Sequence, residues 1–252
     1  MAVEQSRHRF QLGAWIATST IGWTVGLALG SATTYTITIT FHENFGFQLW
    51  WLGVSGAMAG ASVGIMQWLI LRRQLSRAGW WIWASIVGGA VGFSLTGWFP
   101  LNPTVGFGLI GLVGRLGDVT VGAMLGIQIG APIGIMQWFV LRQRFFRAGW
   151  WLLANIVGFA SGFAAASVIN DVVISLFFGI GTALSPSPTP ITAFIAAAVG
   201  GGGLGSVVGL AIGAITGMML AWLWRRTARA QTGQLLLADE RSEWPAATCH
   251  LS

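Results

Sequence analysis

Few side chains in this chain of 252 residues are suited to acid–base or metal chemistry, and they lie outside its long apolar runs. The histidines are His8, His42 and His250, and Cys249 is the single cysteine, so no intrachain disulfide can form. No HExxH, P-loop, CxxC or GxSxG motif stands in a suitable context. The sequence therefore predicts a protein that is not an enzyme and that holds no metal or other cofactor.

Three amide side chains fall within the apolar runs: Gln67, Gln137 and Asn155. Gln67 continues a row of glycines at four-residue spacing, and Gln137 does the same, so both should face a neighbouring helix rather than lipid. The favoured interpretation is an interhelical hydrogen bond, and the alternative is the polar lining of a vestibule. Leu220 occupies the matching place in a third copy of the pattern, which argues against a threefold polar ring.

A second candidate site groups four residues near the ends of apolar runs: Arg115, Asp118, Asn170 and Asp171. Arg115 and Asp118 are three residues apart and can pair on one turn of a helix. Ionisable residues at membrane depth are functional candidates. The alternative is that all four lie at headgroup level and are solvated.

The composition indicates a membrane environment. Hydrophobic residues make up 54% of the chain and charged residues 8%, whereas a soluble domain carries about 25% charged residues. These proportions exclude an ordinary soluble domain, a disordered chain and a disulfide-rich scaffold. The net charge of +6 comes with no nucleic-acid-binding motif. We therefore predict the lipid bilayer as a partner, together with other membrane subunits or a second copy of the chain, and no nucleic acid.

An internal repeat organises the chain. Residues 64–93 and 134–163 align without gaps and are identical at 19 of 30 positions. Weaker copies of the same pattern at 13–27 and 217–226 indicate three units, 13–73, 79–143 and 149–226. We predict an all-α integral membrane fold, a six-helix transmembrane bundle of three parallel two-helix repeats within residues 13–229. The predicted spans are 13–30, 49–71, 79–99, 121–141, 149–169 and 203–224.

Glycines at four-residue spacing run along the predicted spans. Such a row lies on one ridge of a helix and lets two backbones approach closely, which is the main attraction available between helices in lipid. We therefore predict that the bundle packs through glycine ridges. The rows are Gly22, Gly26 and Gly30; Gly56, Gly60 and Gly64; Gly88 and Gly92; Gly122, Gly126, Gly130 and Gly134; Gly158 and Gly162; and Gly205, Gly209, Gly213 and Gly217.

Arginine and tryptophan predict the orientation. With six spans, twelve of the thirteen arginines fall on one side of the membrane. The positive-inside rule then puts both termini, residues 1–12 and 230–252, in the cytoplasm of a bacterium, with the protein in its cytoplasmic-type membrane. Residues flanking the two arginine turns are expected to anchor the bundle at the membrane interface. These anchors are Trp68, Arg72, Arg77, Trp80, Trp81, Trp138, Arg142, Arg147, Trp150 and Trp151.

The connections on the other side are long. Residues 105–116 and 172–184 are apolar but short, which favours re-entrant or interfacial segments over full spans. Residues 33–47 alternate threonine with β-branched or aromatic residues and are a candidate extended segment. Residues 191–224 are too long for one crossing and are expected to extend above the bilayer or to fold at 200–203. A disordered tail is expected after residue 230, with a short surface helix as the alternative.

The repeated GIMQWLILRR…AGWW hairpin resembles the QWLxLR repeats of multi-pass bacterial membrane proteins. That resemblance implies a membrane hairpin and brings no substrate or catalytic residue with it. Two functions fit the sequence. The favoured one is a structural or accessory role, as a subunit or assembly factor of a membrane complex. The alternative is a channel or transporter for a small or apolar solute, since transporters also use internal repeats.

Overall fold

The computed structural model describes residues 11–40, 45–75, 77–98, 115–145, 147–184 and 189–242. Within these ranges every regular element is an α-helix, so the prediction of an all-α fold is confirmed for this part of the chain. Six helices follow one another: α2 (Leu12–Thr40), α3 (Phe45–Leu71), α4 (Gly79–Trp98), α6 (Arg115–Leu141), α7 (Gly149–Leu184) and α8 (Pro190–Ser242).

Five of these helices, all except α4, are long and apolar enough to cross a membrane. Helix α4 has 20 residues and no charge, but four of them are tryptophan, which lowers its hydropathy. The prediction of a membrane-type bundle of apolar helices is thus confirmed. The sixth span stays a prediction.

The helices form a closed ring in the order of the chain. Each helix packs against the next one, and α8 packs against α2 to complete the circle. Backbones on opposite sides of the ring do not come into contact among the described residues. The middle of the ring is therefore filled by side chains.

Glycine lies where α3 meets α4, where α6 meets α7 and where α8 meets α2, which are the boundaries between the predicted units. A Cβ atom added to Gly60 of α3 would lie 2.1 Å from a backbone oxygen of α4, and one on Gly126 of α6 would lie 2.3 Å from a backbone oxygen of α7. On Gly205 of α8 the corresponding distance to α2 is 2.4 Å. Real Cβ atoms do not approach this closely, so a larger residue at any of these positions would push two helices apart.

The two helices within each unit also meet at glycine, but less closely. A Cβ atom on Gly22 of α2 would lie 2.8 Å from a Cα atom of α3, and one on Gly88 of α4 would lie 2.6 Å from a Cα atom of α6. At Gly158, between α7 and α8, the distance is 3.4 Å, which is ordinary van der Waals contact. The interface between α7 and α8 is therefore the loosest of these three at that position.

Apolar and polar side chains are distributed as expected for a protein in lipid. Large apolar side chains are exposed on every helix, for example Ile21, Trp50, Val87, Met124, Val157 and Leu210. Side chains with hydrogen-bonding groups are buried between the helices: Ser19, Ser55, Gln67, Ser85, Gln137, Asn155 and Thr216. Exposed apolar side chains on every helix together with a polar interior fit surroundings of lipid.

Several helices are longer than the sequence suggested. Residues 33–40 belong to α2 and are not extended. Within this helix the hydroxyl of Thr36 donates to the carbonyl oxygen of Ala32 at 2.8 Å, so the polar group is satisfied by the preceding turn. Residues 172–184 continue α7 without a break, so they do not form a separate re-entrant segment. Of residues 105–116, only 115 and 116 are described, at the start of α6.

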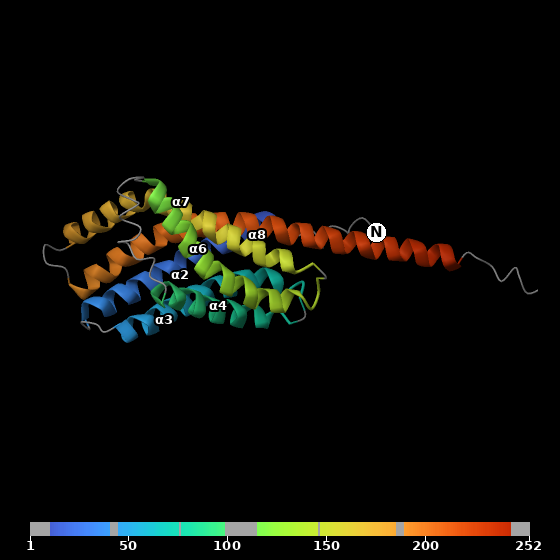
Figure 1. The fold of residues 1–252 in the computed structure, drawn as a ribbon, viewed down its shortest axis with the longest axis horizontal. Coiled ribbons are helices and arrows are strands. Elements are labelled where there is room, and N and C mark those ends of the chain that lie inside the picture. Colours follow the sequence, from blue (N-terminus) through green and yellow to red (C-terminus); the bar gives the residue numbers. More distant parts are fainter. Residues whose placement is uncertain are drawn as a thin grey trace, which may run out of the picture.

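Helix α8 runs for 53 residues and continues through the glycines at 200–203. It also includes residues 230–242, a part of the tail for which the sequence predicts disorder. The glycine run stays helical because it packs on α2: a Cβ atom on Gly201 would lie 2.5 Å from the carbonyl oxygen of Leu27. Tertiary packing here outweighs the low helix propensity of glycine. Beyond the bundle, α8 projects past the other helices (Figure 1) and ends at Ser242.

Candidate functional site

Three tryptophans from alternate helices of the ring meet at its centre. Trp15 of α2, Trp81 of α4 and Trp151 of α7 are at most 1% exposed. The ring centroid of Trp15 lies 6.2 Å from those of Trp81 and Trp151, which are 5.5 Å from one another. All three contacts are edge-to-face, the arrangement that aromatic rings favour. We call these three residues the tryptophan triad.

The triad lies at the end of the ring where the two arginine turns are. The buried cluster around it includes Ala78 of the first turn and Phe145 and Ala148 of the second. The hairpins that join α3 to α4 and α6 to α7 lie at the same end of the bundle (Figure 1). We call this the arginine end. The triad therefore closes the axis of the ring at the arginine end.

Each indole of the triad donates a hydrogen bond to a neighbouring helix. Nε1 of Trp81 donates to Oε1 of Gln67 at 3.0 Å, and Nε1 of Trp151 donates to Oε1 of Gln137 at 3.0 Å. Nε1 of Trp15 donates to Oγ1 of Thr216 at 3.1 Å. An indole N–H buried without a partner would be costly, so these acceptors stabilise the position of each ring.

The amide nitrogen of each of the two glutamines donates a second hydrogen bond. Nε2 of Gln67 donates to Oγ of Ser19 at 3.0 Å, and Nε2 of Gln137 donates to Oγ of Ser85 at 3.0 Å. Each glutamine thereby links three successive helices of the ring. Both are at most 3% exposed, so these amides form interhelical hydrogen bonds and do not line an open vestibule. Asn155, equally buried, donates to the carbonyl oxygen of Trp151 at 3.0 Å.

In the third copy the tryptophan of the triad also has a hydrogen-bond acceptor, but a different type of residue supplies it. Leu220 occupies the place that glutamine has in the first two copies, and it is fully buried beside the triad. The acceptor for Trp15 is instead Thr216, one helical turn earlier, where the other copies have Val63 and Ile133. Leu220 cannot accept a hydrogen bond, but the indole of Trp15 still has an acceptor in Thr216.

Several exposed arginines of the arginine end lie over aromatic rings. The guanidinium carbon of Arg72 lies 5.1 Å from the ring centroid of Trp68, and that of Arg142 lies 5.2 Å from Trp138. Arg226 lies 5.0 Å from Trp222 in the same way. These cation–π contacts hold the charges beside half-buried rings at the arginine end, which suits a boundary between lipid and water.

The predicted interface anchors separate into two groups. Trp80 and Trp150 are 65% and 51% exposed, and Arg77 and Arg147 are exposed next to them in the sequence. Trp81 and Trp151, by contrast, are buried in the triad. The RAGWW motif therefore has one tryptophan on the outer surface and one in the core, because neighbouring residues on a helix point in different directions.

Of the four residues of the second candidate site, only Asn170 has a described side chain. Arg115 and Asp118 fall in the first turn of α6, and Asp171 falls in the middle of α7, but their side chains are outside the described part. Asn170 is half-buried on α7. Among the described residues, no group of three histidines, cysteines or carboxylates is positioned to hold a metal ion.

Sequence reasoning missed Trp15, Ser19, Ser85 and Thr216. A signal for Trp15 was present, since the weak repeat aligns it with Trp81 and therefore with Trp151. Nothing in the sequence marked Thr216. It accepts the hydrogen bond that a glutamine accepts in the other two copies, and the third copy has a leucine in place of that glutamine.

Comparison of the chain with protein-family models, with curated proteins and with solved structures finds no match. The class of the protein therefore follows from its own fold: a membrane-type helical bundle, with a polar network buried among the helices and apolar side chains exposed around them.

Proposed function

We propose that this protein has a structural or accessory role in a membrane, as a subunit or assembly factor of a membrane complex. The observation that carries the proposal is the tryptophan triad, which closes the ring while the amides around it are engaged in internal hydrogen bonds. Such an interior suits a rigid body better than a pathway for solutes. The exposed apolar side chains on all six helices offer surface for lipid and for other membrane subunits.

We further propose that the bundle consists of three parallel two-helix repeats related by rotation about an axis along the membrane normal. Two findings support this arrangement. The ring follows the order of the chain, and residues equivalent in the sequence repeat, such as Trp81 and Trp151, make equivalent hydrogen bonds. Glycine ridges supply the close contacts that hold neighbouring helices together in lipid.

The arginine end is proposed to face the cytoplasm of a bacterium, with both termini on that side. The clustering of exposed arginines in the two turns supports this orientation through the positive-inside rule. Single cysteines in place of Ser76 and Asp171 test it. A membrane-impermeant thiol reagent added outside should label position 171 only, and labelling of position 76 would reverse the orientation.

A channel or transporter for a small solute is the second candidate, and one feature favours it. A cavity of about 350 Å³ lies between α2, α3 and α4, away from the arginine end, and Ser31, Thr34 and Ser55 are among its lining residues. It is bordered by Leu27 and Phe93, which pack on the buried cluster in the middle of the ring. A conducting pathway would have to cross that cluster and then the triad.

Two measurements separate these functions. In proteoliposomes, the structural proposal expects the flux of glycerol and of potassium to equal that of empty vesicles, and a protein-dependent flux would favour the channel. In native membranes solubilised with a mild detergent, we expect the protein to co-migrate at a fixed ratio with one defined membrane assembly. Migration only as an isolated monomer would contradict the accessory role.

A further inference from the structure

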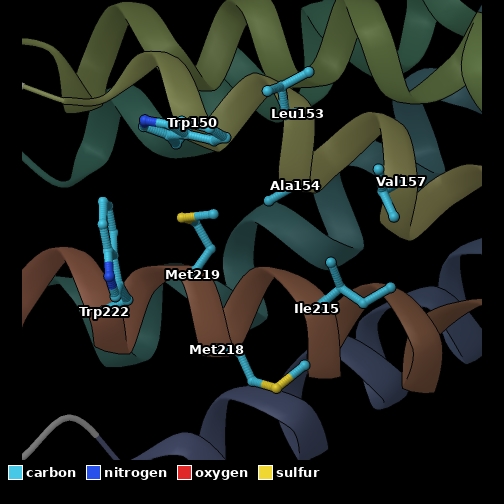
Figure 2. Close-up of a pocket in the computed structure, with 8 residues that line it drawn as sticks. All are labelled: Trp150, Leu153, Ala154, Val157, Ile215, Met218, Met219 and Trp222. Atoms are coloured by element: carbon cyan, nitrogen blue, oxygen red, sulfur yellow. The ribbon is translucent and has the colours of Figure 1, made fainter.

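An apolar groove runs between α7 and α8 on the outer surface of the bundle. It encloses about 610 Å³, within the range of small-molecule sites, and its walls are almost entirely apolar. Figure 2 shows Trp150 and Trp222 at one end of the groove and Val157 and Ile215 at the other, with Met219 projecting between the helices. Trp150 and Val157 are more than half exposed, so the groove opens toward the surroundings of the bundle.

The groove is present because α7 and α8 pack less closely than the equivalent helices α4 and α6. A Cβ atom added to Gly158 would lie 3.4 Å from the nearest atom of α8. At Gly88 of the second unit, the corresponding distance to α6 is 2.6 Å. In addition, Leu153 stands on α7 where the equivalent residue of α4 is Trp83. The looser contact and the smaller side chain leave space between the helices.

Positive charge borders one end of this groove. Arg147 is exposed one turn before Trp150, and its carbonyl oxygen accepts a hydrogen bond from the backbone N–H of Trp150 at 3.3 Å. Arg226 is exposed one turn after Trp222, with its guanidinium carbon 5.0 Å from that ring. None of the side chains described at the arginine end is acidic.

We propose that this groove binds an anionic phospholipid, with an acyl chain along the apolar walls and the phosphate between Arg147 and Arg226. The two parts of the site match the two parts of such a lipid. Apolar walls without polar groups fit a hydrocarbon chain, and two arginines beside interfacial tryptophans fit a phosphate at headgroup depth. The lipid would come from the leaflet that surrounds the arginine end.

Native mass spectrometry of the full chain, titrated with phosphatidylglycerol or with phosphatidylcholine, tests the site. We expect one phosphatidylglycerol to bind more tightly than phosphatidylcholine. The double variant Arg147→Gln and Arg226→Gln should lower the affinity for phosphatidylglycerol by about tenfold. The affinity for phosphatidylcholine should fall by less, because its choline offsets the charge of the phosphate. The matched control is the double variant Arg77→Gln and Arg73→Gln, which alters the equivalent arginines of the first turn and should retain the site.

The groove itself is tested by Leu153→Trp, which places on α7 the residue that α4 already has as Trp83. It should abolish binding of the tightly held lipid, whereas Val87→Trp, on the exposed surface of α4, should not. An unchanged elution volume and Tm establish that both variants fold. Equal binding of the two lipids, or an equal loss in the control variants, would overturn the proposal. A change of oligomeric state in Leu153→Trp would also overturn it, because a second copy would then be the occupant.

Discussion

The two ends of the ring are built differently. At the arginine end, the three equivalent positions of the repeat are all tryptophan, and each indole has a hydrogen-bond acceptor. Two turns further along the same helices, the equivalent positions are Trp23, Gly89 and Phe159. There Trp23 packs edge-to-face on Phe159 with its centroid at 5.1 Å, but its buried indole N–H has no hydrogen-bond partner. Beyond this layer lies the cavity between α2, α3 and α4.

This contrast shows what the sequence repetition preserves. The strictest part of the repeat, QW…LR…AGWW, forms the closed arginine end with its hydrogen-bonded core. The part that varies between units lies toward the other end, where side chains of unequal size fill the ring. A closed, hydrogen-bonded end is thus joined to a less regular one.

The largest difference is expected for truncation of the triad. Trp81→Ala removes a fully buried ring and should destabilise the bundle by about 3–5 kcal/mol. Phe93→Ala, which removes a half-buried ring beside the existing cavity, should cost clearly less. Unfolding in detergent, followed as Tm or by denaturant titration, measures both. Equal losses would mean that the arginine end is no better packed than the other end.

Loss of an acceptor should have the next largest effect. Gln67→Leu leaves the indole N–H of Trp81 buried without a partner and should cost about 1–3 kcal/mol. Gln128→Leu is the matched control, since the buried Oε1 atom of Gln128 has no hydrogen-bond partner to lose. The same unfolding measurement compares them, and a neutral Gln67→Leu would contradict the role assigned to the amide.

A smaller effect is expected in the third unit, where the acceptor is a hydroxyl. Thr216→Val should destabilise the bundle by about 1 kcal/mol, because Trp15 loses its acceptor. Adding Leu220→Gln should recover part of this loss, since it restores the acceptor position that the first two units use. If the double variant is less stable than Thr216→Val alone, the units are not equivalent at this place.

The smallest effect is expected in the middle of the ring. Trp23→Phe removes the unpartnered indole N–H while keeping an aromatic ring against Phe159, so the change in unfolding free energy should be near zero. Trp151→Phe is the comparison at the arginine end, where the substitution leaves Oε1 of Gln137 without its donor. A loss in Trp23→Phe as large as in Trp151→Phe would remove the distinction between the two layers.

The sequence predicts the fold class well because hydropathy and the helix-breaking turns are local properties. It predicts helix ends poorly: residues 172–184 and 230–242 continue helices, and no proline or charge within 172–184 marks the point where a span stops. For the candidate site, the sequence predicted that Gln67 and Gln137 face neighbouring helices, and in the structure their amide nitrogens donate to Ser19 and Ser85. It did not identify Trp81 as a core residue, because an RAGWW motif alone does not tell which indole faces lipid.

Closure of the ring is the central claim, and the accessibility of a residue on its inner side tests it most directly. Ser85 is buried next to Gln137 and is 1% exposed, and a cysteine there is a conservative replacement. With Cys249 replaced by serine, Ser85→Cys in proteoliposomes should not react with a membrane-impermeant methanethiosulfonate from either side, whereas Arg73→Cys should react at the arginine end. Combining Ser85→Cys with Trp81→Ala should allow reaction from that end. Rapid labelling of Ser85→Cys with the triad intact would contradict the account.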